Sequence, residues 1–307
     1  MVMDAVVKRC VEQSPVTVMA RLALQRALEP AWVDKLFERE CGAHYTRELL
    51  FSTTVELMSV VAVGLRPSVH AAAMACKDLP ASEKRLKPLR GFRGAALPGH
   101  SLVVYDPDLD LAVDLVPCED AHAQERSLME AAQSQAQPGD LWIADRNFST
   151  QRVFYGLHDR GSSFIVREHG CTPSPHALEE ERLEGRIETG TLYEQAVEIK
   201  NDAGQRLRLR RVKLQLDHAT EDGDTTIRLL TNLPPSKFTA RRIACLYRQR
   251  WQIESLFQRL ESVLHSEVTS LGHPRAALLA FGVAVLSYNV LAVLQSAVWN
   301  AHELHTS

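Results

Sequence analysis

A segment near the C-terminus combines a polar row with an apolar stripe, and it constrains the fold more than any other feature. Tyr247, Arg250 and Glu254 fall within one narrow sector of a helix, since each residue turns a helix by about 100°. Glu261 continues this row two turns later. A separate face carries apolar residues at helical intervals: Ile253, Leu256, Phe257, Leu260 and Leu264. The spacing predicts one long helix over residues 239–265.

A short apolar run at 141–144 ends on Asp145 and follows the turn residues at 138–140. Such a run predicts a buried strand. Ligand sites in open α/β sheets gather beyond the carboxyl ends of strands, so Asp145 lies where a metal-binding carboxylate is expected. Two simpler interpretations stay open. Asp145 can cap the segment that follows it, and Glu254 can be no more than an i,i+4 partner of Arg250.

The polar row resembles the Tyr-x2-Arg-x3-Glu-x6-Lys signature of bacterial insertion-sequence transposases of the family numbered four, which are of the DDE (Asp-Asp-Glu) type. Tyr247, Arg250 and Glu254 match this signature, whereas Glu261 stands where the family has Lys. The Ala-Asp-Arg-x-Phe context of Asp145 is similar to that of the family's second catalytic Asp. Further similar segments cover most of the chain: 45–51, 85–90, 97–107, 164–167 and 229–234.

The resemblance implies an α/β fold with an RNase H-like catalytic core, a β-rich insertion between the second Asp and the Glu, and a helical N-terminal region. It implies a DNA transposase that catalyses metal-dependent phosphodiester cleavage and strand transfer at insertion-sequence ends. The expected domains are a helical region at 1–72, the first part of the core at 73–167, the insertion at 168–238 and the C-terminal helices of the core at 239–307.

Magnesium or manganese is the cofactor that the resemblance implies, because hard carboxylate oxygens select these ions. Two such ions can stabilise the attacking and leaving oxygens of an in-line displacement. Asp145 and Glu254 are the implied catalytic and metal-binding residues. No covalent protein nucleophile is needed, since water and then a DNA 3′-hydroxyl serve that purpose in the family.

The third metal ligand departs from the family pattern. The family's first catalytic Asp ends a strand shortly before a basic segment, and the corresponding position here is Ala75. Asp78 is the nearest carboxylate and our candidate for the third catalytic and metal-binding residue; the alternative is a solvated loop acid. A stretch that the family carries between the equivalents of His70 and Lys77 is absent, which indicates an internal deletion. A catalytically inactive remnant that binds DNA or a full-length copy is therefore the alternative function.

DNA is the expected partner, as insertion-sequence terminal inverted repeats and target DNA, with a homodimer assembled on it. Tyr247 and Arg250 are implied to hold the transposon end, although Tyr247 also fits a half-buried core aromatic. The net charge of −3 places any DNA contact in local patches. Basic residues cluster in two further segments, for each of which a solvated face is the alternative: Lys84, Arg85, Lys87, Arg90 and Arg93, then Arg206, Arg208, Arg210, Arg211 and Lys213.

Alternating apolar residues predict a hairpin of strands 101–105 and 111–115, which places Asp106 in a turn rather than in a metal site. A helix is predicted at 121–136. Further strands are predicted at 163–167, 192–200, 207–216 and 225–230.

The length of 307 residues and the hydrophobic content of 45% suit one or two globular domains. Six widely spaced cysteines give no sign of a zinc site or a disulfide framework, and the first residues lack the apolar core of a signal peptide. We expect a cytoplasmic protein. The uncharged stretch 276–299 suits either a membrane span or a buried helix, and the resemblance implies the buried helix and no membrane.

Overall fold

The structure, a computed structural model, describes residues 22–41, 50–75, 100–120, 123–170, 174–220, 223–262, 264, 266 and 274–301. These residues form a mixed α/β protein with two compact units, 1–122 with 255–307 and 123–254. Several predicted site residues lie outside the described residues: Asp78, Lys84, Arg85, Lys87, Arg90 and Arg93. The predicted domain boundaries stay predictions.

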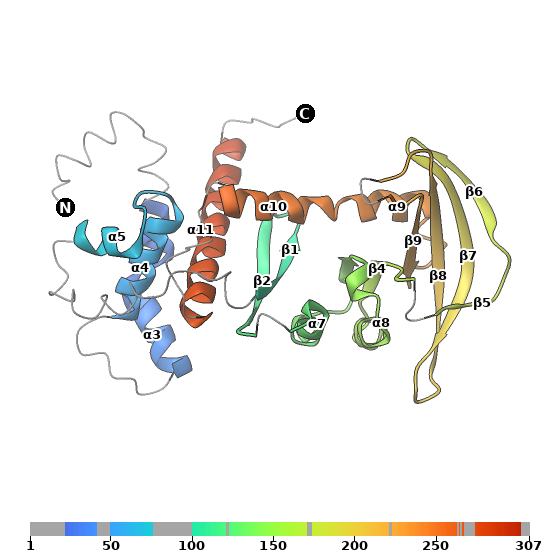
Figure 1. The fold of residues 1–307 in the computed structure, drawn as a ribbon, viewed down its shortest axis with the longest axis horizontal. Helices are drawn as coiled ribbons and strands as arrows, with labels where there is room; N and C mark the ends of the chain where they lie inside the picture. Colours follow the sequence, from blue (N-terminus) through green and yellow to red (C-terminus); the bar gives the residue numbers. More distant parts are fainter. Residues whose placement is uncertain are drawn as a thin grey trace. The chain divides into compact units, whose positions relative to one another are not determined.

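Helices dominate the first unit (Figure 1). Val55 and Met58 of one helix pack with Ala280 and Val283 of another, and Val33 joins the same core. Apolar residues of three helices therefore build the core of this unit. Its main helices are α3 Pro30–Cys41, α4 Phe51–Ala62, α5 Val69–Ala75 and α11 Pro274–Ala301.

A two-stranded antiparallel hairpin, β1 His100–Asp106 and β2 Leu111–Cys118, also belongs to the first unit. The Asp106 carboxylate accepts hydrogen bonds from the backbone N–H groups of Asp108 and Leu109, at 2.9 and 3.1 Å. The predicted hairpin is confirmed, and Asp106 is the last residue of β1, from which its side chain bonds the turn. Asn289 of α11 bonds both backbone groups of Ala112, at 2.9 and 2.8 Å.

The helix α11 is long and apolar enough to cross a membrane by length and composition, which alone is weak evidence for a span. One face is buried in the first unit, where the helix packs on α4 and β2 through Val283, Ala284 and Ser287. Val293 and Val298 are exposed towards its end. The face that packs on α4 and β2 is what a core helix needs.

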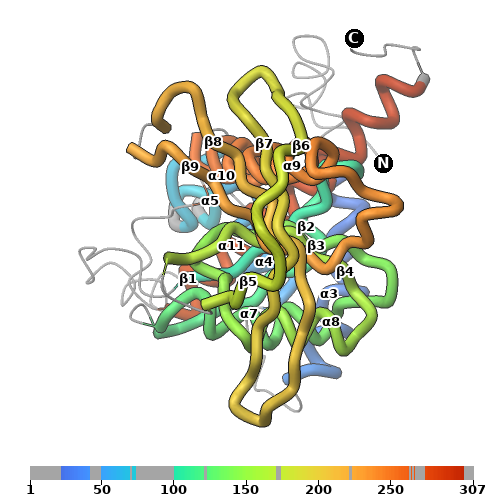
Figure 2. Tube along the Cα trace, turned by 90° about the vertical axis from the view of Figure 1, so that its right-hand side faces the viewer, coloured from blue at the N-terminus to red at the C-terminus, as the bar shows by residue number. Residues whose placement is uncertain are grey.

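One seven-stranded sheet forms the second unit, in the order β3-β4-β9-β8-β7-β5, with β6 paired to β7. The strands β3 and β4 are parallel, and the other pairs are antiparallel. Figure 2 shows β7 and β8 as a long hairpin. Five predicted strands are present, within about two residues of the predicted bounds: β3 Leu141–Ala144, β4 Ser163–Arg167, β7 Gly190–Lys200, β8 Arg206–Leu216 and β9 Thr226–Thr231. The sequence analysis predicted neither β5 His176–Ala177 nor β6 Arg182–Ile187.

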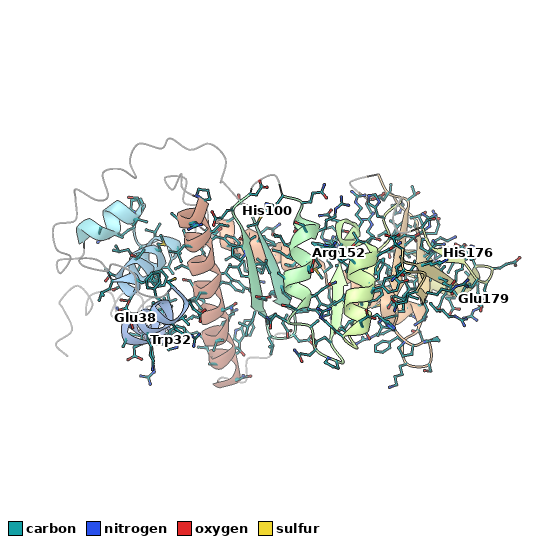
Figure 3. The ribbon with its side chains drawn as sticks, turned by 90° about the horizontal axis from the view of Figure 1, so that it is seen from below. Trp32, Glu38, His100, Arg152, His176 and Glu179 are labelled. Carbon is teal, nitrogen blue, oxygen red and sulfur yellow. The ribbon has the colours of Figure 1, made fainter. Side chains whose placement is uncertain are left out.

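Two helices accompany the parallel strands. The predicted helix at 121–136 is the shorter α7 Glu125–Gln133, and α8 Gln151–Asp159 connects β3 to β4. They approach closely at Gly156, where an added Cβ would lie 2.5 Å from Oε1 of Gln133. Arg152 of α8, labelled in Figure 3, pairs with Glu130 of α7 at 3.1 Å.

The prediction of one helix over 239–265 is wrong. The segment forms α9 Ala240–Arg248 and α10 Trp251–Ser262. Backbone N–H groups at 249, 250, 252 and 253 bond the carbonyl three residues back, so the chain tightens into a narrower turn between the two helices. Tyr247 therefore lies in the last turn of α9, while Glu254 belongs to α10.

Candidate functional site

The parallel strands β3 and β4 bring two charged residues to the same edge of the sheet. Ala144 pairs with Val166, so Asp145 and Arg167 follow at equivalent positions. Asp145 is half-buried and stands before the short helix η2 Arg146–Phe148, but its side chain makes no capping hydrogen bond there. Its carboxylate is thus available for other contacts, as expected for a ligand at the end of a strand.

Tyr247 reaches Asp145 from α9. This helix packs its apolar face on the sheet, with Ile243, Ala244 and Tyr247 in one buried cluster. The Tyr247 hydroxyl donates to Oδ1 of Asp145 at 3.3 Å. Burial raises the pKa of the Tyr247 phenol, and the negative charge of Asp145 raises it further. The phenol therefore stays protonated at neutral pH and acts as a donor.

Arg250 lies between Tyr247 and Glu254. Its guanidinium donates to Oε1 of Glu254 at 2.8 Å and lies 5.9 Å from the centre of the Tyr247 ring. Burial lowers the pKa of Arg250, but Tyr247, Asp145 and Glu254 together raise it above the usual value. Its buried Nε has no hydrogen-bond partner among the described residues. The site thus contains a permanent cation with one unused donor.

The i,i+4 pair of Arg250 and Glu254, given above as an alternative, is present. It occupies one carboxylate oxygen, and 42% of the Glu254 side chain remains exposed. Glu254 as a metal ligand therefore stays a prediction. Glu261 lies on the exposed side of α10.

Asp224 also lies at this edge of the sheet, although nothing in the sequence indicates that position. Asp224, from the turn between β8 and β9, approaches Arg167 and Arg146, the residue that follows Asp145. Arg146 and Arg167 lie in segments that resemble the family, whereas Asp224 lies in no motif or periodic pattern. Only the pairing of β4, β8 and β9 brings them together.

The basic residues of β8 do not form a free cationic face. Each is paired with an acid of the same unit, and Glu179, labelled in Figure 3, is one of these acids. Arg210 also donates to the carbonyls of Leu233 and Phe238, both at 2.9 Å. The pairs are Arg206 with Glu198, Arg208 with Glu179, Arg210 with Glu194, Arg211 with Glu168 and Lys213 with Glu181. These ion pairs use the charges of β8 within the unit, and the largely buried Arg210, Arg211 and Lys213 do not fit a solvated face either.

The donor type at this site suits a divalent cation. Asp145 and Glu254 provide carboxylate oxygens, the ligands that magnesium and manganese prefer. The described residues contain no group of three His, Cys, Asp or Glu side chains placed to hold a metal ion. The predicted third ligand, Asp78, lies outside those residues.

Comparison with known proteins identifies related sequences. The chain matches the family model of the transposase DDE domain over residues 93–290. It is 45% identical over 49 residues, 16% of its own length, to the InsL protein of insertion sequence element IS186A from Escherichia coli (strain K12). The transposase for insertion sequence element IS421 from Escherichia coli shows the same identity and coverage. The alignment covers 13% of the length of either relative.

Proposed function

Because the chain belongs to the transposase DDE domain family, we propose that it is an insertion-sequence transposase that cleaves DNA phosphodiesters and joins the freed 3′ ends to a target. The observation that carries this proposal is the contact of Asp145 with Tyr247. These residues lie 102 positions apart and meet at 3.3 Å, with Arg250 beside them. A carboxylate, a phenol and a guanidinium at the end of a sheet suit the handling of phosphate.

The finer assignments of family and fold belong to the same proposal. We assign the chain to the family numbered four, on the match of Tyr247, Arg250 and Glu254 to its signature. We also assign an RNase H-like core that carries the β-rich segment 168–238, and an internal deletion before Lys77. Mixed α/β architecture with a parallel β3–β4 pair supports this fold.

Asp145, Glu254 and Asp78 are the proposed catalytic residues and would hold magnesium or manganese. A bound ion of this kind supplies charge stabilisation to the attacking and leaving oxygens. Tyr247 orients the Asp145 carboxylate through its hydrogen bond, and its raised pKa keeps it a donor rather than a nucleophile. Arg250 remains cationic and can bind a phosphate oxygen of the DNA end.

The proposed partners are the terminal inverted repeats and the target DNA, with two copies of the chain assembled on them in the cytoplasm. Lys84, Arg85, Lys87 and Arg90 are the proposed further DNA contacts. Glu261 repels phosphate where the family has a cation, so we expect a weaker grip on the transposon end.

A second candidate function is a remnant that binds DNA without cutting it. Two observations favour it: Ala75 stands where the family has its first catalytic Asp, and Glu254 is already paired with Arg250. Such a chain would keep the phosphate-binding cations but lack one of the metal ligands. It could then compete with a full-length copy for the same DNA.

Nicking of supercoiled plasmid with magnesium or manganese separates these two functions. The parent chain is compared with Asp145→Ala and Glu254→Ala. Glu130→Gln is the matched control, because Glu130 is an exposed carboxylate paired with Arg152 on the surface of α7 and α8. An active transposase nicks in its parent and control forms, and both site variants lose this activity.

The other outcomes are equally informative. Salt-sensitive DNA binding without nicking identifies the remnant, since phosphate contacts release counterions and weaken as salt rises. Nicking that survives in both site variants contradicts the assigned residues. A chain that neither nicks nor binds DNA contradicts both functions.

A further inference from the structure

We propose that Arg146 and Arg167 form a binding site for a DNA phosphate, and that the Asp224 carboxylate occupies this site in the free protein. Asp224 would then weaken DNA binding until phosphate displaces it. The inference rests on the proposed function, because it assigns a regulatory contact to the DNA site of that function. All three residues belong to the second unit.

Two guanidinium groups converge on one oxygen atom of Asp224. Oδ2 lies 2.5 Å from Nη2 of Arg167 and 3.7 Å from Nη1 of Arg146. A non-bridging phosphate oxygen is bound by arginines in the same way. The carboxylate therefore has the charge and the position that a phosphate would have.

The pair of arginines stands beside the proposed catalytic acid. Arg146 follows Asp145 in the chain, and Arg167 lies at the equivalent position on the neighbouring parallel strand. A phosphate held by the two arginines would thus lie close to that acid.

Accessibility differs among the three side chains. The Arg167 side chain is 14% exposed, whereas Asp224 and Arg146 are 30% and 48% exposed. The buried cation needs an anionic partner, because an unpaired buried charge is costly. The partner and the second cation are both accessible from solvent, so an external anion can replace Asp224.

The contact of Asp224 lacks the bidentate geometry of two arginine pairs on β8. Arg211 binds Glu168 through two parallel hydrogen bonds of 2.8 and 2.7 Å, and Arg210 binds Glu194 through two of 2.8 Å. Asp224 uses only one oxygen towards both of its arginines. Bidentate pairs hold the sheet, whereas a single-oxygen contact is more easily exchanged.

The turn between β8 and β9 presents Asp224 in a fixed position. Its backbone N–H donates to the Thr220 hydroxyl at 3.1 Å, and its carbonyl accepts from the Thr220 N–H at 2.9 Å. Replacing the carboxylate by an amide therefore leaves the backbone of the turn in place. The variant Asp224→Asn removes the charge and keeps the shape.

The test is DNA binding, measured by fluorescence anisotropy with a labelled duplex of about 30 base pairs over a series of salt concentrations. Asp217→Asn is the matched control. Asp217 lies in the same turn region, is 32% exposed and pairs with Arg186 of β6 at 2.6 Å, so its substitution changes the net charge equally. Asp224→Ala is the second variant, in case the amide keeps a bond to Arg167.

We expect Asp224→Asn and Asp224→Ala to bind the duplex roughly three- to tenfold more tightly than the parent, and Asp217→Asn to change little. The slope of binding against salt should steepen in the Asp224 variants alone, because additional phosphate contacts form. The gain should disappear when Arg167→Gln is added, since the two changes share one site.

Equal affinities of the Asp224 and Asp217 variants, in a parent that binds DNA, would overturn this inference and leave the proposed function in place. Absence of DNA binding in the parent and in every variant would overturn both. A gain that persists with Arg167→Gln would show that Asp224 acts through general charge, which also overturns the assigned site.

Discussion

The two units each hold an acid beside tyrosine and arginine, and they treat it differently. In the first unit, Asp110 accepts hydrogen bonds from the hydroxyls of Tyr105 and Tyr288 and from Nη1 of Arg259, the last two at 2.6 and 3.2 Å. In the second unit, Tyr247 at 3.3 Å is the one side-chain donor to Asp145 among the described residues.

Asp110, whose carboxylate accepts hydrogen bonds from three side chains, has a structural role. Asp110 adopts a left-handed backbone with φ of 54°, which few residues tolerate. Burial raises its pKa, but the bonds from Tyr105, Tyr288 and Arg259 outweigh burial and lower the pKa below the usual value. Burial and the contact with Asp110 raise the pKa of Tyr288 to about 12. Asp110 thus joins the β1–β2 turn to α10 and α11.

The Asp145 carboxylate keeps most of its lone pairs for other contacts. Within the part of the chain that the structure describes, Asp145 has a single long hydrogen bond, and the buried Nε of the nearby Arg250 has no hydrogen-bond partner. Buried polar groups are normally satisfied, and exceptions call for an explanation such as a ligand. The same types of side chain therefore connect helices and strands around Asp110, whereas around Asp145 they leave hydrogen-bonding groups available for a ligand.

Substitution of Asp145 should give the largest effect, which we expect on metal-dependent nicking. We expect Asp145→Asn to reduce metal-dependent nicking on the order of a hundredfold or more, because a metal ligand is lost. Its free energy of unfolding should change by less than about 1 kcal/mol. Plasmid nicking and urea unfolding measure the two quantities. A large loss of stability would break the comparison, since Asp145 would then be structural as well.

Substitution of Asp110 should instead lower the stability of the protein. Asp110→Asn keeps a residue that tolerates the left-handed backbone but removes the charge from three donors. We expect a loss of about 1–2 kcal/mol in the free energy of unfolding, after allowing for partial exposure of the site. Urea unfolding of the parent and the variant gives this difference. Equal free energies of unfolding would mean that the charge of Asp110 does not stabilise the protein.

Acid titration sharpens the same contrast. The pKa of Asp110 is lower in the folded protein than the unfolded value of about 4. Its stabilisation is therefore present above that value and is lost as pH falls through the folded pKa. The stability difference between parent and Asp110→Asn should be constant near neutrality and shrink below pH of about 4. A difference independent of pH would exclude the charge of Asp110 as its source.

Removal of the two tyrosine hydroxyls should give the smallest effects. Tyr288→Phe deletes a 2.6 Å donor to Asp110, whereas Tyr247→Phe deletes a 3.3 Å donor to Asp145. We expect losses of about 1 kcal/mol for the first and less than about 0.5 kcal/mol for the second. Thermal unfolding of both variants side by side ranks them. The reverse order would contradict the distinction between Asp110 as a structural acid and Asp145 as a ligand-binding one.

Local patterns predicted the strands of the second unit closely. Alternating apolar residues at 192–200 and 207–216 predicted β7 and β8, and the run before Asp145 predicted β3. Periodicity reports a half-buried or buried strand directly, because side chains alternate between its faces. The same patterns could not reveal partners. The acids that neutralise β8 come from other strands and loops, so the run of basic residues alone predicts a DNA patch that these ion pairs occupy.

The other misses also have nonlocal causes. Asp110 and Tyr288 are 178 residues apart, and no spacing rule connects them. The break between α9 and α10 depends on a tightened turn at 249–250, which contains neither Gly nor Pro to announce it. Asp145, Tyr247 and Arg250 could be selected from the sequence because each ends or continues a periodic element, but their mutual distances required the fold.

The buried guanidinium of Arg210 has a consequence for the order of assembly. Its bonds to the carbonyls of Leu233 and Phe238 attach the segment before α9 to the long hairpin. The hairpin closes over a short stretch of chain, whereas Tyr247 must find Asp145 across 102 residues, and nonlocal contacts form later. We expect pulse-labelled hydrogen exchange to protect β7 and β8 first and α9 last. The contact of Tyr247 with Asp145 would then be the last part of the second unit to form.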